Sequence, residues 1–242
     1  MIKDVIIVIP AYLPEPTEQD KKNLNKNIEK LSHYDICFAC PEGLDTVYYQ
    51  KNYPLAQIKR FQPFFFEGLQ GYNQLMLSPI FYNAFTAYQY VCICQMDVLI
   101  LKEGNCLEEF VQQGYDYYGA PWLPPHRIYP FSDRLTLKAR LNLFFVRKKV
   151  HVGNGGLSLR KVQSILDVLE RHETLLRKWK IYEDYFYAYI SEYVDNRFQT
   201  APVDVAKRFA LETDSKRVMT EEKVIPVGLH APHKWFPEIY SL

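Results

Sequence analysis

The chain has 242 residues, of which 48% are hydrophobic and 24% are charged, and its formal net charge is +1. This composition excludes a disordered or fibrous chain and leaves ample apolar material for a core. The near-neutral charge gives no general attraction to nucleic acid, so no nucleic-acid partner is expected. No stretch approaches the roughly 18 apolar residues of a membrane span, and the chain opens without a secretory signal. With an odd number of cysteines, five, the expected location is the cytoplasm.

Predicted strands and helices alternate along the first half of the chain. Short apolar runs predict strands at residues 4–9, 35–40, 58–61, 90–94 and 115–119. Apolar residues at helical spacing predict helices at residues 19–32, 71–89 (with a break near residues 78–79) and 105–113. This alternation predicts an α/β fold of three layers, α/β/α, with a mostly parallel central sheet.

The ends of three predicted strands carry the first candidate ligand contacts. Ligands of such sheets bind at the carboxyl ends of the strands. Pro10, Ala11 and Tyr12 follow the first strand, residues 41–42 follow the second, and Gln95-Met96-Asp97 follows the strand at 90–94. We therefore expect these segments to line a pocket.

The second half of the chain is less regular. Residues 134–150 form a basic and apolar stretch, which we interpret first as a solvated helix or excursion. The functional alternative is a lid, or a peripheral contact with an anionic acceptor or with the inner face of a membrane. An amphipathic helix is predicted at residues 161–171, and another begins at Glu183-Asp184. We expect one domain over residues 1–242 with a C-terminal elaboration, divided into halves at 1–122 and 123–242.

Four features have side chains suited to chemistry, and each has an ordinary structural alternative. Asp97 directly follows a buried strand, where a carboxylate suits a cation or a polar ligand, although it could cap a loop. Gly153-Asn154-Gly155-Gly156 indicates unusual backbone angles or close approach of a ligand, or else a tight turn. Glu183-Asp184 could supply a general base or merely stabilise a helix start. His230 follows a strand-like run at 224–227 and would suit a metal if Asp97 lay near it.

Several segments occur in an order that resembles an uncharacterised glycosyltransferase-like family found in bacteria and fungi. The resemblance covers residues 30–235, and its most specific segments are DYYGAPW (116–122) and VGNGGLSLR (152–160). The other matching segments are GYNQL (71–75), FY (81–82), QMD (95–97), ED (183–184) and GLH (228–230).

The family looks like a branch of the GT-A nucleotide-sugar transferases, and the resemblance implies roles for these residues. Asp97 matches the second Asp of the metal-binding DxD motif, and His230 matches a further ligand of Mn²⁺ or Mg²⁺. Gln95 replaces the first Asp, so weaker metal binding is expected. The acidic pair matches the region that supplies the base, which we assign to Asp184 with Glu183 second. Together with the strand ends, the resemblance predicts donor contacts at Pro10, Ala11, Tyr12, Tyr72, Asn73, Gln95, Asp97, Asn154, Gly155 and Gly156.

The predicted function is transfer of a sugar from a nucleotide-diphosphate sugar to a hydroxyl of a glycan or lipid-linked glycan, with inversion, in surface polysaccharide or glycan synthesis. Such a reaction requires stabilisation of the departing diphosphate and a base for the acceptor proton. The main alternative is a non-catalytic nucleotide- or sugar-binding module, which the substitution at Gln95 favours. A nucleotidyltransferase is a third reading, but the first strand end lacks the basic residue and second carboxylate that it would need.

Overall fold

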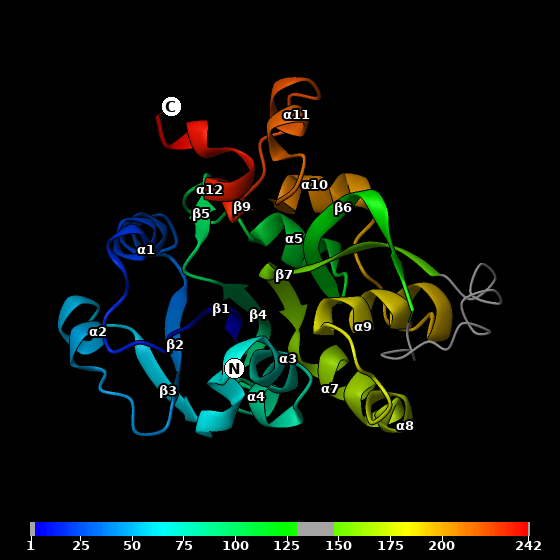
Figure 1. The fold of residues 1–242 in the computed structure, drawn as a ribbon, viewed down its shortest axis with the longest axis horizontal. Helices are drawn as coiled ribbons and strands as arrows, with labels where there is room; N and C mark the ends of the chain where they lie inside the picture. Colours follow the sequence, from blue (N-terminus) through cyan, green and yellow to red (C-terminus); the bar gives the residue numbers. More distant parts are fainter. Residues whose placement is uncertain (1–2, 130–147, 242) are drawn as a thin grey trace, which may run out of the picture.

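The computed structural model describes residues 3–129 and 148–241. Within them the main sheet has six strands in the order β3-β2-β1-β4-β7-β6 (Figure 1). These strands are β1 (Lys3–Pro10), β2 (Asp35–Pro41), β3 (Gln57–Phe61), β4 (Tyr88–Cys94), β6 (Tyr117–Ile128) and β7 (Lys148–Lys161). The first four in spatial order run parallel, whereas β7 is antiparallel to β4 and β6 is antiparallel to β7. The predicted mostly parallel sheet is confirmed.

A second, small sheet lies beside the first. It joins β5 (Val98–Ile100), β9 (Gly228–His230) and β8 (Ala210–Leu211) in that order. Strand β5 leaves the carboxyl end of β4 after a short turn and pairs antiparallel with β9, so Val98 lies opposite His230. This pairing brings a segment near the end of the chain to the carboxyl edge of the main sheet.

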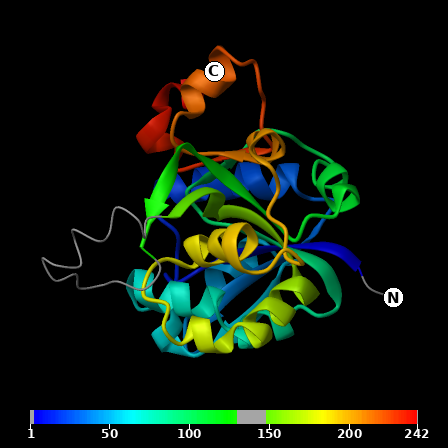
Figure 2. The ribbon, with the colours of Figure 1, turned by 90° about the vertical axis from the view of Figure 1, so that its right-hand side faces the viewer.

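Helices cover both faces of the main sheet, which gives the predicted three layers (Figures 1 and 2). One face carries α3 (Gly68–Met76), α4 (Pro79–Asn83), α7 (Val162–Arg171), α8 (Glu173–Leu176) and α9 (Glu183–Tyr189). The other carries α1 (Glu18–Lys30), α2 (Val47–Asn52), α5 (Glu108–Gln113) and α10 (Val203–Phe209). The remaining helical segments are η1 (Pro63–Phe66), η3 (Ile190–Val194), α11 (Ser215–Thr220), α12 (Pro232–Trp235) and η4 (Pro237–Ser241).

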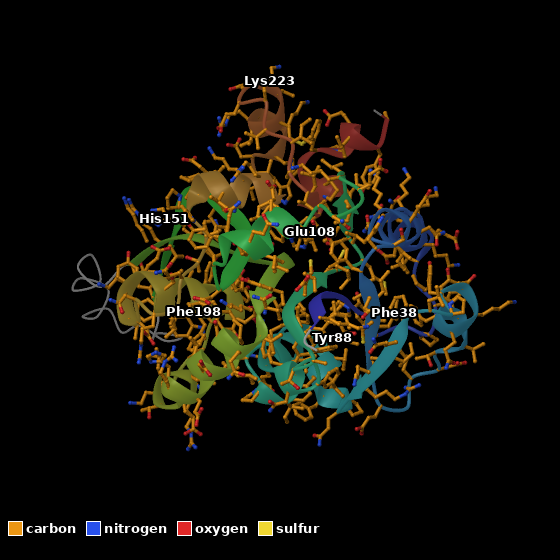
Figure 3. All side chains as sticks on the ribbon, turned by 180° about the vertical axis from the view of Figure 1, so that it is seen from behind. Phe38, Tyr88, Glu108, His151, Phe198 and Lys223 are labelled. Carbon is orange, nitrogen blue, oxygen red and sulfur yellow. The ribbon has the colours of Figure 1, made fainter. Side chains whose placement is uncertain are left out.

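The central strands are apolar throughout because both of their faces are buried. In β1, the side chains of Ile6 and Val8 pack into one core, and those of Val5, Ile7 and Ile9 pack into the other. Figure 3 labels Phe198, which belongs to the core of Ile6 and Val8, and Phe38, which belongs to the core of Ile7. The two cores hold the carboxyl ends of β1 and β4 in fixed positions, and the site is built there.

Two predicted local structures are wrong. The glycine-rich run at 153–156 forms no turn: it lies inside the long strand β7, and none of its glycines has a positive φ. The strand-like run at 224–227 is not a strand, and the strand is β9, which contains His230. In both places the apolar or glycine residues are there because side chains pack closely around them. The prediction had instead assigned them a local backbone conformation, a turn in one case and a strand in the other.

Among the described residues, no helix has the length and apolar character needed to cross a membrane. Most of the basic stretch predicted as a peripheral contact, residues 134–147, lies outside the described residues. Its last residues, 148–150, begin strand β7.

Candidate functional site

Two connected pockets lie at the carboxyl edge of the main sheet. The larger has a volume of about 450 Å³ and is lined by Pro10, Tyr12, Asp20, Phe65, Phe66, Gly68, Leu69, Tyr72, Gln95, Met96 and Asp97. The smaller has a volume of about 140 Å³ and is lined by Leu69, Tyr72, Asn73, Gln95, Asn154, Gly155, Gly156, Tyr182, Glu183, Asp184 and His230. Leu69, Tyr72 and Gln95 line both pockets, so the two form one cleft with a wide and a narrow part.

The strand geometry explains why these residues meet. Strands β1 and β4 run parallel, so their carboxyl ends, at Pro10 and Cys94, lie at the same edge of the sheet. The antiparallel neighbour β7 passes this edge at its middle, where the backbone N–H of Gln95 donates to the carbonyl of Gly156 over 2.9 Å. Residues far apart in the sequence therefore form one wall of the cleft.

A polar network crosses the wall of the narrow part. His230 Nε2 lies 3.5 Å from Asp97 Oδ1, and His230 Nδ1 lies 3.2 Å from Glu212 Oε1. The other carboxylate oxygen of Glu212 accepts from Asn154 Nδ2, and Asn154 Oδ1 accepts from the backbone N–H of Gly156 over 3.2 Å. His230 is thus held between two carboxylates, one at each ring nitrogen.

The electrostatics of this network follow from burial and charge pairing. Burial by itself lowers the pKa of His230, but the two carboxylates outweigh it and raise the pKa to about 9. Burial by itself raises the pKa of Asp97, but contact with His230 brings the pKa below its ordinary value. At neutral pH the network therefore favours an ionised Asp97 beside a protonated His230.

The residues around Asp97 and His230 offer few ligands for a metal ion. Within the described residues, no group of three or more His, Cys, Asp or Glu side chains is arranged around one point to hold an ion. At this site the reason is that the two carboxylates face opposite nitrogens of His230. Asp97 and His230 Nε2 remain as a facing pair, and proteins hold Mg²⁺ by one or two carboxylates together with substrate phosphates. A metal here would require His230 to lose its proton, and its remaining ligands would have to come from a substrate diphosphate.

Glu183 forms an ion pair with a buried cation. Its Oε1 lies 3.0 Å from Arg160 Nη2, and both side chains are almost completely buried, at 4% and 0% exposure. Arg160 also donates to Ser158 over 2.9 Å and to the Tyr82 hydroxyl over 3.0 Å, and it lies over the rings of two tyrosines of the same core, Tyr117 and Tyr187. Burial raises the pKa of Glu183, and the contact with Arg160 counteracts this rise. Glu183 is therefore held in one orientation.

Asp184 has a different environment. It follows Glu183 in the first turn of α9 and is half-buried, and its Oδ1 accepts from the N–H of Tyr185 over 2.8 Å. Burial and the neighbouring charge of Glu183 raise the pKa of Asp184 to about 7. A carboxyl group with a pKa near 7 can exchange a proton at neutral pH, as a general base requires.

The glycine run in β7 is explained by the side chains that press against it. A Cβ on Gly155 would overlap Glu183, and a Cβ on Gly156 would overlap the ring of His230. A Cβ on Gly153 would overlap the ring of Trp122. The predicted alternatives of special backbone angles or a turn are replaced by close approach of neighbouring side chains.

The structure brings together most of the predicted site residues. Asp97 and His230 meet, and the acidic pair shares the narrow pocket with Asn73, whose Oδ1 accepts from the N–H of Glu183 over 2.7 Å. Ala11 differs from this pattern, because its side chain is buried in the core and does not line the cleft.

Two polar residues and two aromatic residues of the site were missed by the sequence reasoning. Arg160 left a readable signal, because it is a charged residue that ends an apolar strand segment, and such a residue needs a buried partner. Glu212 left none: it is one acidic residue among many in the C-terminal region, and only the tertiary fold places it against His230. The aromatic lining residues Phe65 and Phe66 were also absent from the predicted set.

The architecture is that of the GT-A-like glycosyltransferase fold. The structure of LgtC, a galactosyltransferase solved with donor and acceptor sugar analogues, has a TM-score of 0.53 at 13% identity, with 93% of this chain and 86% of that chain covered. Mouse xyloside xylosyltransferase 1 has a TM-score of 0.53 at 10% identity, with 95% and 97% covered. GlyE of Streptococcus pneumoniae TIGR4 has a TM-score of 0.51 at 10% identity, and 95% of this chain spans 54% of that chain, about half its length.

The chain belongs to the DUF5672 family, described as a protein of unknown function, whose model matches residues 55–230. No curated protein matches the chain in sequence. At these identities the solved structures show the fold alone. The predicted GT-A-like fold is confirmed, and the predicted activity stays a prediction.

Proposed function

We propose that this protein transfers a sugar from a nucleotide-diphosphate sugar to a hydroxyl group of a glycan or lipid-linked glycan, in glycan or surface polysaccharide synthesis. The observation that supports it is the two-part cleft, in which Asp97 borders the wide part and His230 and Asp184 border the narrow part. The wide part, lined by Tyr12 and two phenylalanines, suits a nucleoside, and the narrow part suits one sugar. Asp97 and His230 lie near the junction, where the diphosphate would be.

The proposed reaction requires one bond to form and one to break. An oxygen lone pair of the acceptor forms the bond to the anomeric carbon, and the bond from that carbon to the diphosphate oxygen breaks, with its electron pair staying on the phosphate. The acceptor proton passes to Asp184. If the acceptor approaches from the face opposite the diphosphate, the anomeric configuration inverts.

The roles of the residues follow from their environments. Asp184 is proposed as the base because its raised pKa, about 7, matches a proton acceptor at neutral pH. Glu183 is the second candidate, but its contact with Arg160 favours a binding role. Asp97 and His230 would hold Mn²⁺ or Mg²⁺, which supplies charge neutralisation of the departing diphosphate when bound.

We place the reaction in the cytoplasm, with the basic segment 134–150 as a candidate peripheral contact at the inner face of the membrane. The support is the sequence pattern of that segment. Vesicle co-sedimentation with and without anionic lipid tests this placement.

The second candidate is a non-catalytic binding module, favoured by Gln95. A neutral amide at this position is a weaker cation ligand than a carboxylate. The function of the cleft would then be recognition of a nucleotide sugar without transfer, and Asp184 would only stabilise the start of α9.

The test uses UDP-glucose, UDP-galactose and GDP-mannose, with UDP and GDP alone, each with and without Mn²⁺. Thermal stabilisation measures binding, and release of free nucleoside diphosphate in the presence of glycan acceptors measures turnover. We expect stabilisation that increases with Mn²⁺, together with turnover of one donor. Binding without turnover over a broad acceptor panel would favour the binding module, and no binding of any nucleotide would contradict both candidates.

A further inference from the structure

Three buried polar atoms of residues that line the narrow pocket have no hydrogen-bond partner among the described residues. One of them, His230 Nδ1, is instead paired by charge with Glu212 Oε1 at 3.2 Å. The other two are the hydroxyl of Tyr72 and Oε2 of Glu183. The amide of Gln95 adjoins the Tyr72 hydroxyl, but without hydrogen-bond geometry. A buried polar atom without a partner costs free energy, so two of them in one pocket require an explanation.

Neither atom is free to turn toward solvent. Glu183 is 3% exposed, its other oxygen is held by Arg160, and its backbone N–H donates to Asn73. Tyr72 lies on α3 in the wall shared by the two pockets, and its hydroxyl is buried. The structure thus keeps both atoms unpaired at fixed positions in a cavity of about 140 Å³.

The two atoms have complementary chemistry. A phenol donates an O–H, whereas an ionised carboxylate only accepts. A ligand that satisfies both offers one oxygen that accepts and one O–H that donates, as neighbouring hydroxyl groups of a sugar ring do. The cavity has room for about five waters at liquid density, which is the scale of one monosaccharide ring.

The charges of the pocket restrict the ligand further. Glu183 and Asp184 supply two carboxyl groups, and the guanidinium of Arg160 is already paired with Glu183 and with neutral oxygens. The His230 imidazolium is likewise paired, with Asp97 and Glu212. A ligand that carries its own carboxylate would therefore meet like charge here, with no unpaired cation among the described residues that line the pocket. A neutral hydroxylated ring would not.

We propose that Tyr72 and Glu183 are specificity-determining residues that select a neutral, hydroxylated monosaccharide as the transferred group, Tyr72 by donating to one ring oxygen and Glu183 by accepting from a ring hydroxyl. This inference rests on the proposed function, because it takes the narrow pocket as the sugar part of the donor site. It assigns a preference for hexoses with free hydroxyls over their deoxy and uronic-acid counterparts.

The experiment compares the wild type with Tyr72→Phe, which removes only the hydroxyl and keeps the ring. Tyr90→Phe is the matched control, because the Tyr90 hydroxyl donates to the carbonyl of Tyr115 over 3.0 Å and Tyr90 does not line the cleft. Calorimetric titration gives the affinity for UDP, UDP-glucose, a monodeoxy analogue of UDP-glucose and UDP-glucuronate. If GDP-mannose is the donor that stabilises the protein, GDP, GDP-mannose, its monodeoxy analogue and its uronic-acid analogue take their places.

We expect Tyr72→Phe to keep the affinity for the nucleoside diphosphate and to bind the hexose donor about tenfold more weakly. The variant should melt no lower than the wild type, since it loses an unpaired buried hydroxyl. The wild type should bind at least one monodeoxy analogue about tenfold more weakly, and Tyr72→Phe should bind that analogue as well as the wild type does. Tyr90→Phe should show no change in donor affinity.

The outcomes separate this inference from the proposed function. Equal binding of the hexose donor by the wild type and Tyr72→Phe, or equal binding of the hexose and uronic-acid donors, overturns the inference and leaves sugar transfer intact. The comparison of donors on the wild type needs no variant, so it remains decisive if Tyr72→Phe does not fold. Absence of binding to every nucleotide and nucleotide sugar overturns the proposed function and this inference with it.

Discussion

Glu183 and Asp184 are neighbours in sequence and line the same pocket, yet their surroundings give them different chemistry. Glu183 shares its carboxylate with the buried guanidinium of Arg160, which restricts both its charge and its orientation. Asp184 has no such cation within hydrogen-bond distance among the described residues, and its pKa rises to about 7. The pair therefore divides into a side chain fixed for binding and a side chain able to take a proton.

Asp184→Asn should lower turnover by about 10² to 10⁴-fold and leave donor affinity nearly unchanged, because it removes the proton acceptor and keeps the shape. In the wild type, kcat/KM should rise with pH through about 7 as Asp184 loses its proton. Steady-state kinetics across pH, with donor affinity measured on the same preparation, check both.

Asp97→Asn is the matched comparison for Asp184→Asn. It should weaken donor binding and its dependence on Mn²⁺ together, because it removes a ligand rather than a base. A folded Asp184→Asn variant with near-normal turnover would show that Asp184 is not the base, and Glu183 would be tested next.

Glu212→Gln should weaken Mn²⁺ binding in the presence of nucleoside diphosphate by about 10 to 100-fold. The reason is that Glu212 lies 3.2 Å from His230 Nδ1 and orients the ring toward Asp97, and partners of this kind tune metal ligands. The imidazole pKa of His230, which the two carboxylates raise to about 9, should fall in the variant. Titration of the His230 ring by NMR checks this without any activity measurement, and an unchanged pKa would count against the positioning role.

At the scale of single elements, β7 does the most to shape the site. It pairs with β4 on one side and β6 on the other, and its glycine run contacts Trp122 of β6, Glu183 of α9 and His230 of β9. A side chain at any of these glycines would displace a buried group. The strand thus acts as a flat surface on which the site is assembled.

Gly153→Ala should lower the free energy of unfolding by about 2 to 3 kcal/mol, because the added Cβ overlaps the buried ring of Trp122 and forces the core to shift. Gly104→Ala is the control: Gly104 has φ +68° and no neighbour within 4 Å of an added Cβ. Gly104→Ala should lower the free energy of unfolding by about 1 kcal/mol, through backbone strain alone. Urea denaturation of both variants checks the difference, and equal losses would mean that Trp122 moves aside easily.

At the scale of the whole molecule, Asp195 joins segments that pack on the same face of the sheet. Its buried carboxylate accepts from Arg197 Nε over 2.8 Å and from Arg171 Nε over 3.0 Å, and it lies 3.1 Å from His172 Nε2. Hydrogen bonding to Arg197, with smaller contributions from His172 and Arg171, holds the pKa of Asp195 well below its usual range although burial opposes this. The end of α7 is thereby tied to the chain that follows η3.

Asp195→Asn should lower the free energy of unfolding by about 2 kcal/mol at pH 7. A carboxyl group whose pKa is lower in the folded state stabilises the protein above its unfolded pKa, 3.8, and this contribution is lost as the pH falls toward the folded pKa. The gap between wild type and variant should therefore shrink below pH 4, as measured by chemical denaturation across pH. The control Asp167→Asn removes a half-exposed carboxylate 3.9 Å from Arg171 and should change stability by less than about 0.5 kcal/mol.

The sequence alone determined the alternation of strands and helices and the α/β class. A strand buried on both faces must be a short apolar run, as at β1 and β4, and such runs are local and readable. The sequence also pointed to the strand ends, where Asp97 lies, because the carboxyl edge of a parallel sheet is a general place for ligands.

Only the tertiary structure decided the direction of β7, the small second sheet and the partners of the site residues. The spacing of apolar residues indicates that a strand is buried. It does not indicate which strands pair with that strand, or whether they run parallel or antiparallel to it. Asp97 meets His230 because β5 pairs with β9, and Glu212 joins them because it directly follows β8, which pairs with β9 on its other side. The glycines of β7 were misread for the same reason: their small size accommodates side chains that are distant in sequence, and such contacts exist only in the folded chain.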